Sequence, residues 1–350
     1  MRHSLRHHRS FTLTLQLLLA ACVAVVSMSV HGAIAQDTAT HGRAIENIEA
    51  SLGGLPEIAE SVELSIGNFD LPHGGHLQGI QLRRDEARQR DIAFLSHDSE
   101  TVAYLVVAEF PLGLAGAGVV THIHKFPSDG QSPPLRHAGG FQIAGGVLAI
   151  GLEDNQLKTR SEIQFWNIAD AAKPTQLERL TIRRRGQPKE QTAGAVAIAP
   201  RSQDHLVAVA NWDSRAIDFY VSNAKPLAES ACRFSHLAQW RVDTADTEAW
   251  HPDRQFGTYQ AINFVTGANG RLYLLGFNTE STGADVVDLF AVSVNETPAR
   301  MLSKLARKSI KLVAGSHFRS SGGASTAGGQ LTILASPSQL AGELQLNFAR

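Results

Sequence analysis

His137-Ala138-Gly139-Gly140-Phe141-Gln142-Ile143 opens the stretch of sequence that decides the fold. Two apolar runs follow it, at residues 146–154 and 163–168, with small or polar residues between the runs. Short apolar runs bounded by turn residues are typical of β-strands. The stretch therefore predicts three successive strands, and weaker copies of it along the chain predict a repeated unit.

Each copy starts where a small residue enters a strand, at Gly79, Gly140, Ala195, Ala261 and Ala324. These entries lie 55 to 66 residues apart. Further strands follow in each repeat, and the outermost and most polar ones are expected at residues 119–126, 177–182, 236–242 and 304–312. Four antiparallel strands per unit, with hydrophobicity falling outward, are typical of a propeller blade. We expect an all-β fold, a five-bladed β-propeller.

The last unit has only three predicted strands before the sequence stops at Arg350. Proteins usually cover an unpaired strand edge, because it can pair with another chain. The strand predicted at residues 62–66 precedes the first unit and can supply the missing fourth strand. This N-terminal strand would complete the last blade and close the ring. Six or seven blades are the alternative, but they need units of about 42 to 50 residues, which is shorter than the spacing found.

Three segments carry a resemblance to a known group of proteins. They are His-Ala-Gly-Gly-Phe-Gln at residues 137–142, Ile-Gln-Phe-Trp-Asn-Ile-Ala-Asp at 163–170 with Lys173-Pro174 after it, and Asn-Trp-Asp-Ser at 211–214. In these segments the chain resembles secreted bacterial β-propeller proteins of the LVIVD-repeat type. The resemblance covers most of residues 75–350. It implies a propeller fold and an extracytoplasmic setting, and it supplies no catalytic residues.

Residues 1–35 have the layout of a secretory signal peptide. Three arginines and no acid precede a mostly apolar run at residues 11–30, and Ala-Ile-Ala at 33–35 forms a cleavage site. The alternatives are a retained N-terminal membrane anchor and a lipoprotein modified at Cys22. We expect a periplasmic or secreted protein with no transmembrane segment after cleavage. Residues 36–60 would form a leader with a short helix, and residues 61–350 the propeller.

Composition excludes several classes of protein. Removing the three arginines of residues 1–35 from 32 basic residues leaves 29 against 33 acidic residues, a net charge of −4. No basic stripe remains, so we expect no nucleic-acid partner. Cys232 is the only cysteine after residue 35. An intramolecular disulfide and cysteine-based metal centres are therefore excluded from the mature chain.

Propeller geometry predicts where a site should lie. Each inner strand begins on the face that also carries the loop between the second and third strands, so polar side chains from both would line one funnel. His76 and His137 occupy matching positions, three residues before a strand glycine. The predicted ligand-binding residues are His76, Gln78, His137, Gln142, Asp154, Trp212, Asp213, Gln260 and Asn263.

We expect this funnel to bind a small polar ligand, such as a sugar, or an envelope protein, without covalent chemistry. A hydrolase acting on a glycan or phosphoester is the alternative, with Asp98, Asp154 and Asp213 as acid, base or metal ligands. The inner-strand entries contain no Asp or Glu, which argues against glycoside hydrolysis because that reaction needs two carboxyl groups beside the scissile bond. A structural scaffold in an envelope assembly is a third hypothesis.

No cofactor motif is present in the sequence. Oxygen atoms of the funnel loops could hold a calcium ion, although Asp, Asn and Ser are also the ordinary residues of turns. His122 and His124 would share one face of an outer strand, a spacing that can bind a metal.

Overall fold

The computed structural model describes residues 44–127, 130–340 and 342–350. The predicted signal peptide and the lipoprotein site at Cys22 lie outside the described residues. The described residues belong to one compact unit, residues 39–350. Within its described residues, no helix has the length and apolar character needed to cross a membrane.

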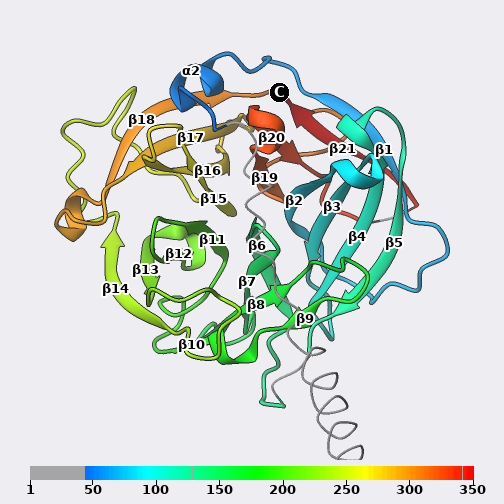
Figure 1. Ribbon diagram of the computed structural model, residues 1–350, viewed down its shortest axis with the longest axis horizontal. Helices are drawn as coiled ribbons and strands as arrows, with labels where there is room; N and C mark the ends of the chain where they lie inside the picture. The colour runs from blue at the N-terminus through cyan, green and yellow to red at the C-terminus, as the bar shows by residue number, and fades with distance from the viewer. Residues whose placement is uncertain (1–43, 128–129, 341) are drawn as a thin grey trace, which may run out of the picture. The chain divides into compact units, whose positions relative to one another are not determined.

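In the part of the chain that the structure describes, the fold is all-β apart from one short α-helix and six short 3-10 helices. Within the described residues, the antiparallel pairings form five ladders of strands arranged around a common centre (Figure 1). The first ladder consists of β2 (Leu77–Asp85), β3 (Arg90–His97), β4 (Tyr104–Pro111) and β5 (Gly118–Lys125). The second consists of β6 (His137–Ala144), β7 (Val147–Glu153) and β8 (Arg160–Asn167). Two short strands, β9 (Thr175–Gln176) and β10 (Ile182–Arg185), both pair with β8. The third is β11 (Ala195–Pro200), β12 (His205–Ala210), β13 (Ala216–Ser222) and β14 (Phe234–Arg241), and the fourth is β15 (Ala261–Thr266), β16 (Leu272–Thr279), β17 (Asp285–Val292) and β18 (Leu302–Ser309).

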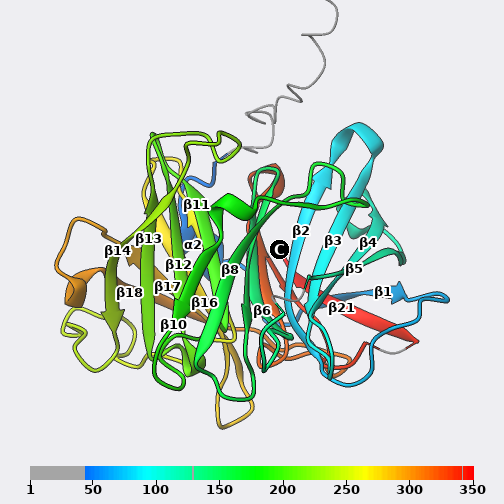
Figure 2. The same cartoon turned by 90° about the horizontal axis from the view of Figure 1, so that it is seen from below.

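The fifth ladder combines the two ends of the unit. It contains β19 (Gly322–Ser325), β20 (Thr332–Ala335), β21 (Glu343–Ala349) and β1 (Glu60–Ser65). β1 pairs antiparallel with β21, from Glu60 opposite Phe348 to Ser65 opposite Glu343, and the two strands lie along each other in Figure 2. The predicted closure of the last unit by the N-terminal strand is confirmed.

Short parallel pairings join neighbouring ladders. Gly79 of β2 pairs with Gly322 of β19, and Leu64 and Ser65 of β1 pair with Gly118 and Val119 of β5. The first and fifth ladders thus form one closed path of hydrogen-bonded strands, while the second and third ladders form one nine-stranded sheet. The sheets are propeller-like in arrangement.

The apolar core lies between ladders rather than at the centre. One cluster packs β6 and β7 side chains such as Phe141 and Ile150 against Phe94 and Leu105 of the first ladder. Clusters of the same kind separate the other neighbouring ladders. Because both faces of an inner sheet are covered, a strand such as β7 is buried along its whole length, which explains its continuous apolar sequence.

Inner strands approach each other closely at the centre, where β2, β6, β11, β15 and β19 lie innermost (Figure 1). A Cβ atom on Gly139 would lie 2.2 Å from the carbonyl oxygen of Gly194, and one on Gly140 would lie 2.7 Å from that of Gln260. Only glycine leaves room for this contact. The Gly-Gly pair that marks the decisive stretch is therefore required by packing.

Buried amides also tie the inner strands together. Gln142 of β6 accepts hydrogen bonds from the N–H groups of Ile198 (3.1 Å) and Phe264 (2.8 Å), and donates to the carbonyl of Phe264 (2.7 Å). Asn263 of β15 accepts hydrogen bonds from the N–H of Ala324 (2.7 Å) and from the Gln81 amide (2.9 Å). These side chains bridge strands that belong to different ladders.

The predicted leader does contain a short helix, α2 (Ile48–Gly53). The side chain of Asn47 caps it by accepting a hydrogen bond from the Ala50 N–H at 2.9 Å. Ile48 and Leu52, one turn apart, are buried in a core cluster with residues of the fourth and fifth ladders. α2 therefore covers the outer side of β18 (Figure 1).

The predicted strand at residues 177–182 is wrong. That segment contains the 3-10 helix η3 (Glu178–Leu180), because Leu180 turns inward and is 2% exposed in the core. Short strands β9 and β10 flank it. The other 3-10 turns are η1 (Glu86–Arg88), η2 (Leu112–Leu114), η4 (Trp212–Ser214), η5 (Pro298–Arg300) and η6 (Ala327–Gly329).

Candidate functional site

Three predicted residues meet where β2 and β6 begin. The amide nitrogen of Gln78 lies 3.0 Å from His137 Nε2 and 3.0 Å from His76 Nδ1. Gln78 sits in an irregularity of the β2–β3 pairing, between Leu77 and Gly79. Such bulges redirect side chains and are common beside functional sites. The bulge here points Gln78 across to the second ladder.

His137 contacts the carboxylate of Glu153 on the neighbouring strand. The two residues face each other as partners at the start of β6 and the end of β7. His137 Nδ1 lies 3.1 Å from Glu153 Oε1, an ion-pair distance, although the angles do not meet those of a hydrogen bond. The other carboxylate oxygen accepts a hydrogen bond from the Ala193 N–H at 2.6 Å. Glu153 is fully buried and His137 is 7% exposed.

This arrangement changes the acidity of His137. Burial alone would lower its pKa, but the Glu153 carboxylate, with a smaller contribution from Asp98, outweighs burial and raises the pKa above the ordinary value of 6.5. The Lys158 ammonium opposes the rise. The buried carboxylate thus stabilises the charged form of His137 by more than burial destabilises it.

Trp212 and Lys158 extend the site toward solvent. The Trp212 ring lies 6.0 Å from the His137 ring, centroid to centroid, and the Lys158 ammonium lies 3.5 Å from the Trp212 ring centroid. Thr192 holds the backbone of Trp212, because its hydroxyl accepts the Trp212 N–H at 2.6 Å. We call His76, Gln78, His137, Glu153, Trp212 and Lys158 the His137 cluster.

The acids of the predicted hydrolase site are engaged separately. Asp98 accepts the backbone N–H of His76 at 2.6 Å. Asp154 accepts the N–H groups of Gln156 and Leu157 at 2.9 and 2.7 Å within its own turn. Burial raises the pKa of Asp154, but these N–H bonds, with others of the same loop, outweigh it and lower the pKa below its usual range. Asp213 is exposed in η4, where its φ is 62°.

Two predicted binding residues serve another role. Gln142 and Asn263 are buried, at 8% and 0% exposure, and their amides are used in the bonds between inner strands described above. We therefore assign them to holding the inner strands together rather than to ligand contact. Gln260 is half-buried immediately before β15, and its backbone N–H donates to the Phe277 carbonyl.

The described residues contain no group of three His, Cys, Asp or Glu side chains able to hold a metal ion. His122 is exposed on β5, whereas His124 lies 4.8 Å from the Trp166 ring, centroid to centroid, in an edge contact. Burial lowers the pKa of His124. Cys232 is a free, buried thiol.

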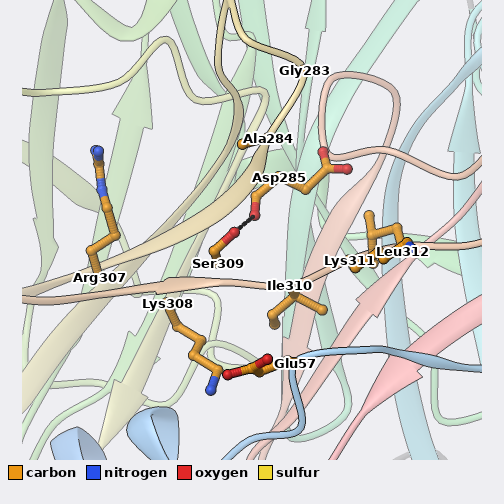
Figure 3. Close-up of a pocket in the computed structure, with 10 residues that line it drawn as sticks. All are labelled: Glu57, Gly283, Ala284, Asp285, Arg307, Lys308, Ser309, Ile310, Lys311 and Leu312. Carbon is orange, nitrogen blue, oxygen red and sulfur yellow. Dashed lines mark hydrogen bonds between the residues drawn. The ribbon is translucent and has the colours of Figure 1, made fainter.

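A depression of about 620 Å³ lies elsewhere, against β18 (Figure 3). Glu57, Asp285 and the side chains of residues 307–312 line it. The Arg307 guanidinium is already paired with Asp288 at 2.7 Å, and the Lys308 ammonium donates to the Gly53 carbonyl at 3.2 Å. The charged groups here are largely engaged in holding the leader and the fourth ladder.

Sequence reasoning missed two members of the His137 cluster, Glu153 and Lys158, as binding residues. Glu153 could have been found, because the first residue of one strand faces the last residue of the next in a tight hairpin. Lys158 could not, since its position depends on the turn held by Asp154.

No protein-family model matches the chain, and no curated protein matches it. Several solved structures are similar in fold. The catalytic domain of the GH62 α-L-arabinofuranosidase of Coprinopsis cinerea is 10% identical, with 84% of this chain and 98% of that chain covered and a TM-score of 0.49. The α-L-arabinofuranosidase PaAbf62A of Podospora anserina has the same identity, coverage and score.

The GH43 β-xylosidase/α-arabinofuranosidase CoXyl43 from a compost microbial metagenome is 11% identical, with coverages of 81% and 94% and a TM-score of 0.47. Likeness at this level carries no argument about activity or substrate.

Proposed function

We propose that this chain is a periplasmic or secreted five-bladed β-propeller that binds a polar ligand at the His137 cluster and catalyses no covalent reaction. The observation that carries the proposal is the convergence of polar side chains from three ladders. His76 and Gln78 come from the first, His137 and Lys158 from the second, and Trp212 from the third. The chemistry of the cluster suits a ligand that forms hydrogen bonds.

Five blades correspond to the five antiparallel ladders. The parallel pairings between ladders are short, with one residue pair between β2 and β19 and one between β6 and β11. Each ladder also packs its apolar faces on its neighbours, as separate blades do. The extracytoplasmic location and the likeness to LVIVD-repeat propellers rest on the sequence alone.

The hydrolase hypothesis is less well supported. A general acid for glycoside cleavage needs a raised pKa, whereas the pKa of Asp154 is lowered by its own turn. Asp98 is occupied by a backbone N–H group and Asp213 is exposed. The scaffold hypothesis would need a broad apolar surface, but the large exposed apolar side chains of the described residues are scattered over different elements.

The test uses a glycan array and the variants Trp212→Ala and His76→Ala. The matched control is His122→Ala, because His122 is an exposed histidine on β5 outside the cluster. We expect wild type and control to bind the same glycans and the two cluster variants to lose them. Binding that survives in both cluster variants would place the ligand elsewhere. Release of product from a panel of aryl glycosides, abolished by Asp98→Asn, would replace the binding proposal by the hydrolase.

A further inference from the structure

Lys158 brings an unpaired positive charge to the rim of the His137 cluster. Its ammonium lies over the Trp212 ring at 3.5 Å from the centroid. Among the described residues, no carboxylate forms an ion pair with this ammonium. An indole face attracts a cation through its quadrupole but does not neutralise it. The ammonium therefore remains able to bind an anion.

His137 supplies a second positive charge when it is protonated. Three titratable groups act on it: Glu153 from β7, Asp98 from the loop after β3 and Lys158 from the loop after β7. A fourth, His76 from the segment before β2, contacts the same Gln78 amide as His137 does. The two carboxylates favour the imidazolium, and Lys158 disfavours it. An anion bound beside Lys158 would neutralise the ammonium and so remove its lowering effect on the pKa of His137. Anion binding and proton uptake by His137 should therefore promote each other.

Gln78 allows His137 to exist in both charge states. Its amide nitrogen faces His137 Nε2 at 3.0 Å, which suits an imidazole whose Nε2 accepts a hydrogen bond. When Nε2 carries a proton, the amide must present its oxygen instead, which requires a half-turn of the terminal amide group. That half-turn directs the two amide N–H donors away from His137.

The acids at the rim do not cancel these charges directly. Asp98 is 7% exposed and one of its oxygens is bound to the His76 N–H. Asp213 follows Trp212 in the chain but is exposed, where water and salt screen its field. Glu153 is fully buried against His137, and its negative charge is balanced by the imidazolium when His137 is protonated.

We propose that the His137 cluster takes a ligand carrying an anionic group, a carboxylate or a phosphate, beside the Lys158 ammonium where it lies over the Trp212 ring, and that His137 takes up one proton as the ligand binds. The inference rests on the proposed ligand-binding function and names its chemical class. Glu153 acts in it as a positioning residue, because it holds the imidazolium without reaching the ligand.

The test compares three hexoses that differ only at carbon 6: glucose, glucuronate and glucose 6-phosphate. Binding is measured by calorimetry in buffers of different ionisation enthalpy, and by the ring resonances of the histidines. We expect one or both anions to bind at least about tenfold more tightly than glucose, the effect of one charge-assisted hydrogen bond. Above the pKa of His137, the dissociation constant should rise by up to about tenfold per pH unit, with one proton taken up. The carboxylate and phosphate arms identify which anion fits.

Two variants separate the roles. Lys158→Met should remove the preference for anions, whereas the control Lys173→Met, in an exterior turn after β8, should keep it. Glu153→Gln keeps the shape of the side chain and an acceptor for the Ala193 N–H, and should abolish proton uptake and flatten the pH profile. A role in stability alone would leave that profile unchanged.

The possible failures are distinct. Equal binding of glucose and the two anions would overturn the anionic class and leave the proposed function standing. Anion binding that survives Lys158→Met, or that takes up no proton, would also overturn the inference. If neither anion perturbs the His137 resonances, the inference is wrong, and the glycan array then decides the proposed function independently.

Discussion

Replacing Gln142 by leucine tests how the centre of the fold is held together. The Gln142 amide satisfies the N–H of Ile198 and both the N–H and the carbonyl of Phe264. Leucine is apolar and one atom shorter and cannot form these bonds, so three backbone groups lose their partners in a buried site. Each such group costs about 1–3 kcal/mol. The three groups together cost about 3 to 9 kcal/mol, and the burial of leucine returns about 2 kcal/mol. We therefore expect the free energy of unfolding to fall by about 1 to 7 kcal/mol.

The assay is equilibrium unfolding in urea, monitored by tryptophan fluorescence. The matched control is Gln187→Leu, because Gln187 is exposed in the loop after β10, and it should change stability by less than about 0.5 kcal/mol. A folded domain has only about 5–15 kcal/mol of stability, so Gln142→Leu should shift the urea midpoint markedly. A shift no larger than that of the control would show that the amide bridges do not hold the inner strands.

Three further changes test other parts of the fold. Leu64 is fully buried in β1, so Leu64→Ala should lower the free energy of unfolding in urea by about 2–5 kcal/mol. A loss of stability no greater than that of Glu63→Ala, at the exposed neighbouring position, would argue that β1 does not close the last ladder. Lys304→Met removes a buried ammonium 3.0 Å from Asp288 and should destabilise the protein by about 3 kcal/mol, whereas Lys308→Met on the same strand should have little effect. Burial raises the pKa of the Cys232 thiol, so a thiol reagent should react with it only as fast as the protein unfolds, and rapid labelling of the folded protein would contradict its position.

The repeated architecture could be predicted because its signals are local. Gly79 and Gly140 mark strand entries whose neighbours must approach closely, and the alternation after them is visible within a few residues. The pairing of β1 with β21 followed from a single physical requirement, that the last ladder should not leave an open edge. That long-range contact needed no information about side chains.

The role of each polar residue was harder to predict. Gln78 and Gln142 both occur near strand entries in the sequence, yet a bulge directs Gln78 to His137, while Gln142 bonds to two neighbouring inner strands. Asp154 looked like a ligand but is used by its own turn. The orientations of Gln78 and Gln142 follow irregularities in strand register, which change the face a side chain points to and leave no trace in composition.

The pairing of β1 with β21 also has a consequence for biosynthesis. A ribosome delivers β1 before the other described strands and β21 after them, so β1 must wait for the synthesis of all the strands between them before it finds its partner. Until then, the edges of β1 and β20 remain open to other chains. Nascent polypeptides of this kind should depend on chaperones that shield strand edges until β21 has been synthesised.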